Sequence, residues 1–167
     1  MKGGTYATGT TVSPEKTRWE IEAVLKRYGA VGFAYASEAR CARIEFLANK
    51  RRVRFDVTLP DPKDARFRST ARGRWRYPGE RSDAMSAKAH EAEVRRLWRA
   101  LLLAIKAKLE VVQSGMAIFE EEFLGNIVMP DGRTVGEHVA PKIAQAYASG
   151  RAVALLPAFA GDDAEGA

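Results

Sequence analysis

The chain has 167 residues, of which 46% are hydrophobic and 29% are charged, and its formal net charge is +6. This length and composition predict one globular domain and exclude a wholly disordered chain. A single cysteine, Cys41, excludes an intramolecular disulfide and any zinc site built from several thiolates. No apolar run predicts a secretory signal or a membrane span, so we expect a soluble cytoplasmic protein without a membrane partner.

The first element in chain order is a helix. Residues 1–12 are rich in Gly and Thr and predict a flexible arm. Ser13-Pro14 is typical of an N-cap followed by the first helical residue. The Ser hydroxyl can accept a hydrogen bond from a free backbone amide of the first turn, and Pro has no backbone N–H that would lack a partner there. Ile21, Val24 and Leu25 then recur at helical spacing, which predicts a helix over 14–28.

Three strands are expected next, over 31–37, 42–48 and 52–59. The last two alternate apolar and polar residues, which predicts a sheet with one buried and one solvated face. Asn49-Lys50 fits a hairpin turn between them. The solvated face and its turn should expose four basic residues: Arg43, Lys50, Arg52 and Arg54.

The second half of the chain predicts mainly helices. Asp83 is expected to cap a long helix over 84–113, and a short helix follows over 116–124. A small hairpin around Pro-Asp-Gly-Arg and a capping box from Thr134 to Glu137 lead into a helix over 135–149. The expected core comprises Trp19, Ile21, Phe33, Ile44, Phe46, Val53, Phe55, Trp98, Leu101 and Ile105.

These elements predict an α+β fold in which a helix, a three-stranded antiparallel meander and a long packing helix precede a helical and hairpin extension. The core spans residues 13–113 and carries a long basic loop at 61–82. The extension spans 114–160, and an acidic tail, 161–167, ends the sequence. The length of the long helix exceeds what a three-stranded sheet needs, which favours a homo-oligomer.

Residues 65–78, which we call the arginine–aromatic segment, are the strongest indication of function. They combine five arginines with three aromatic residues and contain no acid. Guanidinium groups neutralise phosphates and aromatic rings stack on bases, so the segment predicts a contact with single-stranded nucleic acid. The alternative is a solvated loop that only keeps the protein soluble. The expected contacts here are Arg66, Arg68, Arg72, Arg74, Trp75, Arg76 and Tyr77, with Arg43, Lys50, Arg52 and Arg54 extending the track along the sheet.

No catalytic set or cofactor motif is recognisable. Three adjacent carboxylates, Glu120, Glu121 and Glu122, do not face one another on a helix, so they predict a solvated face and no metal site. His90 and His138 lack the spacing of metal ligands, and Cys41 on a strand is typical of a small apolar side chain. We therefore expect neither an enzyme nor a bound cofactor.

The order of a helix, a three-stranded meander and a long helix flanked by basic residues resembles single-strand annealing proteins of phage type, whose core is a β-β-β-α unit. The matching parts are 31–37, 42–48, 52–59 and 84–113. The chain also resembles phage and prophage proteins that are small and basic. The resemblance implies ring or filament assemblies that hold single-stranded DNA in a basic groove, in the cytoplasm of a host cell.

The sequence thus favours non-enzymatic binding of single-stranded nucleic acid, with DNA as the first choice and annealing in phage-type recombination as the activity. Two other hypotheses remain open. One is a protein-binding adaptor or phage inhibitor that docks the basic loop on a host enzyme. The other is a structural assembly protein whose long helix and C-terminal third form the contacts.

Overall fold

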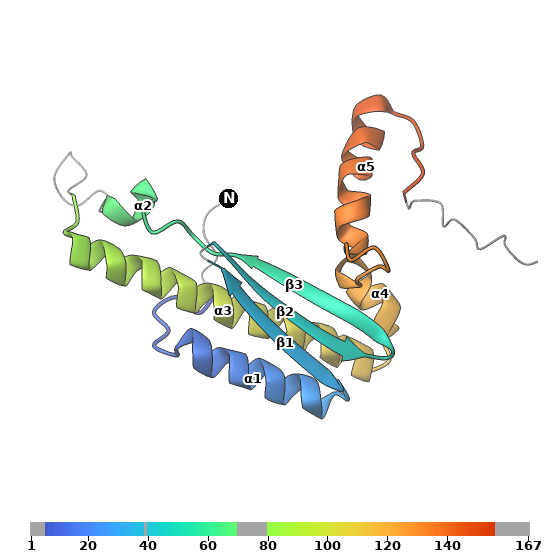
Figure 1. Cartoon of the computed structure of the whole chain (residues 1–167), viewed down its shortest axis with the longest axis horizontal. Coiled ribbons are helices and arrows are strands. Elements are labelled where there is room, and N and C mark those ends of the chain that lie inside the picture. Colours follow the sequence, from blue (N-terminus) through green and yellow to red (C-terminus); the bar gives the residue numbers. More distant parts are fainter. Residues whose placement is uncertain (1–5, 39, 70–79, 156–167) are drawn as a thin grey trace, which may run out of the picture.

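The computed structural model describes residues 6–38, 40–69 and 80–155. The fold is mixed α+β, as the sequence predicted, with a sheet, two long helices on one of its faces and a C-terminal helical extension (Figure 1). In chain order the elements are α1 (Pro14–Arg27), β1 (Gly32–Glu38), β2 (Cys41–Ala48), β3 (Arg51–Thr58), α2 (Ala65–Arg68), α3 (Asp83–Gln113), α4 (Phe119–Phe123), a 3-10 turn (Leu124–Asn126) and α5 (Val135–Ser149).

The three strands form an antiparallel meander in the order β1-β2-β3. Ile44 of β2 pairs with Tyr35 of β1 and with Phe55 of β3, so these residues share one face of the sheet. Asn49 and Lys50 join β2 to β3 with φ values of 47° and 60°. Two successive positive φ angles are those of the type I′ turn, which matches the twist of the two strands and confirms the predicted hairpin.

The core lies between this face of the sheet and the helices α1 and α3, which run side by side beneath it (Figure 1). Ile44, Ile105 and Val53 are fully buried, and Trp98 is 2% exposed. Ten residues were expected in this core. The structure buries six of them and half-buries three against the cluster: Ile21, Ile44, Phe46, Val53, Trp98 and Ile105, then Phe33, Phe55 and Leu101.

Trp19 is the exception, because its side chain is 76% exposed. The buried face of α1 carries Ile21, Val24 and Leu25. At 100° per residue, Trp19 lies about 160° from Ile21 and therefore points away from the core. Its assignment to the core was wrong.

The ends of the helices follow from local hydrogen bonds. The Ser13 hydroxyl accepts from the Lys16 amide at the start of α1, as expected. The cap of α3 is Ser82 and not Asp83, because the Ser82 hydroxyl accepts from the Met85 amide and Asp83 is the first helical residue. None of the helices in the described ranges is both long enough and apolar enough to cross a membrane.

The structure departs from expectation in two further places. Residues 61–82 were expected to form a loop, yet Ala65–Arg68 forms one helical turn because the Asp64 carboxylate accepts from the Arg66 amide and Phe67 is buried. The helix expected over 116–124 is only Phe119–Phe123. The predicted capping box at Thr134 and Glu137 is confirmed, and α5 ends at Ser149, after which Gly150 is left-handed.

The C-terminal extension is attached to the free edge of β3. The Val128 amide donates to the Arg52 carbonyl over 2.8 Å, and Val53 and Ile127 form an isolated antiparallel bridge. From this anchor α5 stands away from the sheet, at the opposite end of the molecule from α2 (Figure 1). The sheet is thus extended on one side by residues from far along the chain.

Candidate nucleic-acid interface

The solvated face of the sheet carries the predicted arginines, but each of them has an acidic partner. The Arg43 Nε lies 2.6 Å from Oδ1 of Asp56, and the Arg52 Nε lies 3.7 Å from a Glu45 oxygen. Exposed carboxylates this close offset the positive charge that a phosphate would meet. Lys50 is exposed at the tip of the hairpin.

Arg54 is buried, which corrects its predicted exposure on this face. Its side chain is 7% exposed and lies under the start of α5. Nη2 lies 2.6 Å from Oε2 of Glu137, and Nη1 donates to the Gly132 carbonyl over 2.9 Å. Nε lies 3.2 Å from an Asp56 oxygen without the alignment of a hydrogen bond. These partners hold Arg54 as a structural link between β3 and the C-terminal extension.

The arginine–aromatic segment begins on α2. Arg66 and Arg68 are exposed there, and Ser69, the last described residue of the segment, forms an isolated antiparallel bridge with Glu80. The Arg81 amide also donates to the Arg68 carbonyl over 2.7 Å. Five further predicted contacts lie outside the described residues: Arg72, Arg74, Trp75, Arg76 and Tyr77.

A groove of about 500 Å3 lies directly beside this segment, between α2, the start of α3 and the N-terminal residues Thr8 and Gly9. We call it the α2 groove. Three arginines line it, Arg66, Arg81 and Arg96, with Glu93 as the one acid in its lining. The Arg81 guanidinium donates to the carbonyls of Arg66 and Phe67, so its positive charge has neutral partners.

Glu93 offsets part of the charge in the α2 groove. Arg96 makes a two-pronged contact with its carboxylate, at 2.7 and 2.8 Å. The hydrogen bond from Arg96 holds the pKa of Glu93 below its ordinary value, so this carboxyl stays ionised at neutral pH. Arg66 also has an acidic partner, because its Nε lies 3.2 Å from a carboxylate oxygen of Asp64. The excess positive charge of the groove is therefore carried by Arg81, whose partners are carbonyls.

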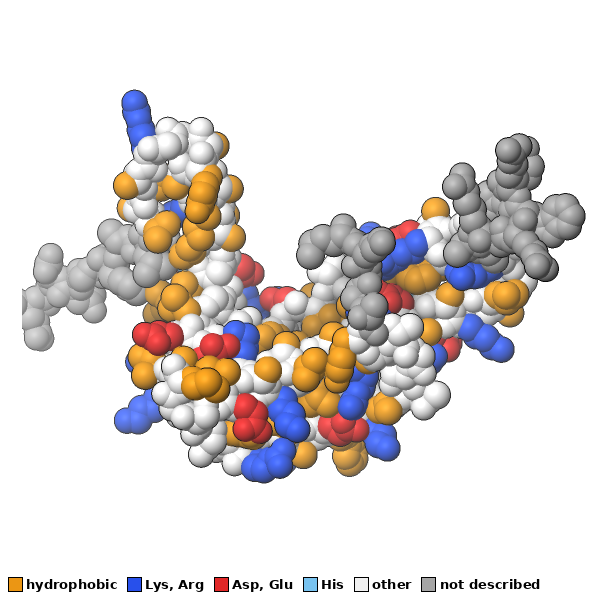
Figure 2. Space-filling model, turned by 180° about the vertical axis from the view of Figure 1, so that it is seen from behind, with side chains coloured by type: hydrophobic (Ala, Val, Ile, Leu, Met, Phe, Trp, Pro, Cys, Tyr) orange, Lys and Arg blue, Asp and Glu red, His pale blue; other side chains and the backbone are white. Residues whose placement is uncertain are grey.

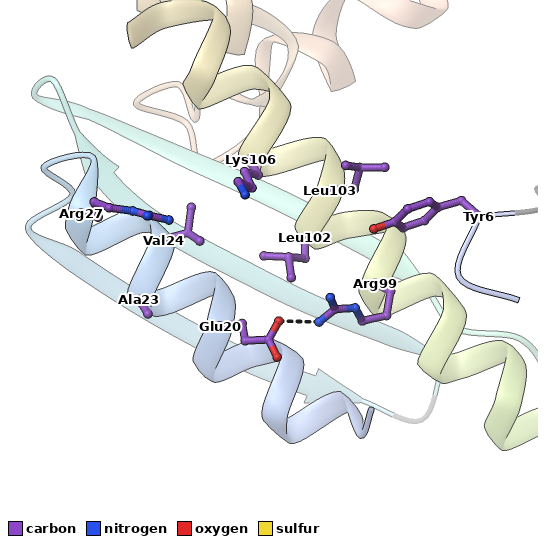
Figure 3. A pocket seen from close by; sticks show the side chains of 9 residues that line it. All are labelled: Tyr6, Glu20, Ala23, Val24, Arg27, Arg99, Leu102, Leu103 and Lys106. Atoms are coloured by element: carbon purple, nitrogen blue, oxygen red, sulfur yellow. Dashed lines mark hydrogen bonds and ion pairs between the residues drawn. The ribbon is translucent and has the colours of Figure 1, made fainter. Parts of the chain in front are cut away.

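A second groove, of about 560 Å3, lies between α1 and α3. We call it the α1–α3 groove. Arg99 and Glu20 form an ion pair at one end, whereas Arg27 and Lys106 extend from the two helices over the other end (Figure 3). Val24 and Leu102 contribute apolar surface between them, and the ring of Tyr6 lies at the rim.

The remaining surface divides into two kinds. Seen from behind, Lys and Arg lie among Asp and Glu over the body of the molecule, whereas hydrophobic side chains gather on the upright α5 arm (Figure 2). A groove of about 410 Å3 at the base of that arm has an apolar lining that includes Leu124, Val139 and Ile143. This end of the molecule therefore suits apolar contacts and not a polyanion.

Sequence reasoning missed several residues that the structure brings together. Arg81 and Arg96 come to Arg66 in the α2 groove, and Arg27 and Lys106 face the α1–α3 groove. Arg96, Arg99 and Lys106 recur at three- and seven-residue intervals, which places them along one side of α3. That interval is visible in the sequence, but the partner elements that close each groove are not.

The described residues contain no group of three His, Cys, Asp or Glu side chains that could hold a metal ion. His90 instead lies with Nε2 3.0 Å from the Pro60 carbonyl and with its ring edge-on to Phe67, so it packs the start of α3 against the chain that leads to α2.

Comparisons of the chain with protein-family models, with curated proteins and with solved structures gave no match.

Proposed function

We propose that this protein binds single-stranded nucleic acid without catalysing a reaction, with DNA annealing or protection in phage-type recombination as the activity. The observation that carries the proposal is the α2 groove, in which Arg66, Arg81 and Arg96 from three separate segments converge beside the arginine–aromatic segment. Guanidinium groups in a groove track a phosphate backbone without reading its sequence.

Annealing needs a strand that is held by its backbone while its bases stay available. Arginines in the groove would hold phosphates, and Trp75 and Tyr77 of the adjoining segment would supply stacking surfaces. Base pairing with a second strand then provides the free energy, so no cofactor is required. A homo-oligomer would align successive stretches of one strand.

Fluorescence polarisation with a labelled single-stranded oligonucleotide tests the proposal. We expect the affinity to fall by orders of magnitude between about 50 and 200 mM salt, because neutralised phosphates release counterions. The double variant Arg66→Ala/Arg68→Ala removes two exposed cations of α2, of which Arg66 pairs with Asp64 and Arg68 has no acidic partner within ion-pair distance among the described residues, and it should weaken binding. Arg43→Ala/Arg52→Ala removes the same charge from the sheet face, where both arginines have a carboxylate partner, and should have the smaller effect.

The aromatic contribution has its own test. Trp75→Ala/Tyr77→Ala should weaken binding to a single strand more than binding to duplex, since only unpaired bases offer free faces for stacking. Equal losses on both would indicate a purely electrostatic contact. Binding by the wild-type protein that is weak and independent of salt would refute the function itself.

A further inference from the structure

The α2 groove and the α1–α3 groove follow one another along the same side of α3. Ala89, Ala92 and Arg96 line the first, and Arg99, Leu103 and Lys106 line the second. From Ala89 to Lys106 this side of the helix spans about 26 Å at 1.5 Å per residue. The same N-terminal stretch borders both grooves, because Thr8 and Gly9 line the α2 groove and Tyr6 lines the α1–α3 groove.

The far end of the α1–α3 groove carries positive charge that the described part of the chain does not neutralise. Arg99 forms an ion pair with Glu20. Neither Arg27 nor Lys106 has an acidic partner within ion-pair distance among the described residues. The nearby Glu110 accepts a hydrogen bond from the Tyr28 hydroxyl. Two cations at the mouth of an open groove suit phosphate oxygens.

Aromatic and apolar surface lies next to these cations. Tyr6, at the rim, is 46% exposed. Trp19 is 76% exposed and lies one helical turn before Ala23, which lines the groove. Exposing most of an indole ring leaves a large apolar area in water, and base stacking would cover it.

The sheet face is the poorer path for the same ligand. Its three arginines, Arg43, Arg52 and Arg54, lie within 4.0 Å of carboxylates of Glu45, Asp56 or Glu137. The two grooves along α3 are lined by six cations. Three of them pair with carboxylates, Arg66 with Asp64, Arg96 with Glu93 and Arg99 with Glu20. The other three have no acidic partner within ion-pair distance among the described residues: Arg27, Arg81 and Lys106. Charge therefore favours the helical side.

We infer that the α1–α3 groove is a second binding station for the same single strand, with Arg27 and Lys106 on phosphates and Trp19 as a stacking platform for a base. The strand would leave the arginine–aromatic segment, pass through the α2 groove and continue along α3. This inference rests on the proposed function. It places the single-stranded nucleic acid along the helices, whereas the sequence predicted contacts along the sheet face.

The test uses the variant Arg27→Ala/Lys106→Ala, which removes two exposed side chains. Its affinity is measured for oligothymidylates of increasing length at several salt concentrations. On the longest oligonucleotide the slope of log affinity against log salt should fall by about 1.4, because each phosphate contact contributes about 0.7 for a single strand. Lys26→Ala/Lys142→Ala removes the same charge outside both grooves and should leave that slope nearly unchanged. Circular dichroism checks that each variant is folded.

Trp19→Ala provides a readout that does not depend on charge. Loss of one stacked base should weaken binding of the long oligonucleotide by about 5- to 150-fold. In a Trp75→Phe background, quenching of tryptophan fluorescence on binding should persist, because Trp19 is exposed and Trp98 is buried. Quenching that disappears in this background would contradict the stacking role.

The outcomes separate the inference from the function. If Arg27→Ala/Lys106→Ala behaves like its charge-matched control while Arg66→Ala/Arg68→Ala loses affinity, the second station is refuted and the proposed function stands. If the wild-type protein fails to bind any oligonucleotide, both are refuted. A reduced salt slope confined to the Arg27/Lys106 variant, with weaker binding by Trp19→Ala, supports the second station.

Discussion

The Arg54 guanidinium and the Glu137 carboxylate meet at 2.6 Å, which joins the middle of β3 to the first turn of α5. Glu137 also accepts from the Thr134 amide over 2.6 Å, so one carboxylate serves both the ion pair and the capping box. This shared carboxylate explains why α5 keeps a defined attachment although most of its surface faces solvent.

Replacing Arg54 should therefore destabilise the protein. Arg54→Ala removes hydrogen bonds to Glu137 and to the Gly132 carbonyl. Because the Glu137 side chain is 44% exposed and regains water, we expect a loss of about 1.5–3 kcal/mol in the free energy of unfolding, which is less than for a fully buried pair. Urea unfolding gives this value. Arg52→Ala, whose side chain is 54% exposed, should cost less than about 1 kcal/mol.

Acid should weaken the same attachment. The backbone hydrogen bond from Thr134 and the nearby Arg54 charge hold the pKa of Glu137 below its ordinary value of 4.5. A lowered pKa in the folded state means that the stabilisation is complete above pH 4.5 and is lost as pH falls further. Urea unfolding of wild type and Glu137→Gln from pH 7 to pH 3 should show a difference in stability that narrows below pH 4.5. A difference that stays constant would exclude this role of the carboxylate.

Helix α3 offers a matched pair for testing the core. Ile105 is fully buried, whereas Leu103, two residues earlier, is 44% exposed. Ile105→Ala should lower the free energy of unfolding by about 2–5 kcal/mol through lost burial and a cavity. Leu103→Ala should change it by less than about 0.5 kcal/mol, as surface changes usually do. Similar losses for the two would show that α3 packs by a different face.

The close approach of two glycines supports the base of α5. A Cβ added at Gly136 would lie 2.7 Å from the Gly125 carbonyl oxygen, whereas one added at Gly125 would meet no atom within 4 Å. Gly136→Ala should therefore push α5 from the preceding 3-10 turn and cost about 1–3 kcal/mol. Thermal unfolding of Gly136→Ala beside Gly125→Ala measures this, and equal melting temperatures would contradict the close approach.

Local patterns accounted for most of the fold. Four predicted features depend only on residues that are close in sequence, and the structure confirms each of them. They are the alternation in β2 and β3, the Ser13 cap, the Asn49-Lys50 turn and the Thr134–Glu137 capping box. The assignment of Trp19 to the core was wrong, because a large aromatic side chain does not by itself decide which face of a helix is buried. The spacing of Ile21, Val24 and Leu25 already pointed the other way.

The candidate site was harder to anticipate because it depends on distant parts of the chain. Alternation placed Arg54 on the outer face of β3 correctly, yet it could not show that Gly132 and Glu137 cover that face. Likewise, Arg66 and Arg96 are 30 positions apart and share a groove only because α2 packs on α3. The role of the arginine–aromatic segment remains a prediction, since Arg72 to Tyr77 lie outside the described residues.

The link between Arg54 and the C-terminal extension also has a consequence during synthesis. Arg54 and Glu137 are 83 positions apart. At about 5–20 residues per second, Glu137 is added to the nascent chain about 4–17 s after Arg54. The three strands of the meander are neighbours in sequence and can pair long before that. Until the C-terminal extension is made, the outer edge of β3 and the Arg54 side chain therefore stay exposed to water. A ribosome that pauses between these positions would prolong the time for which this edge is uncovered.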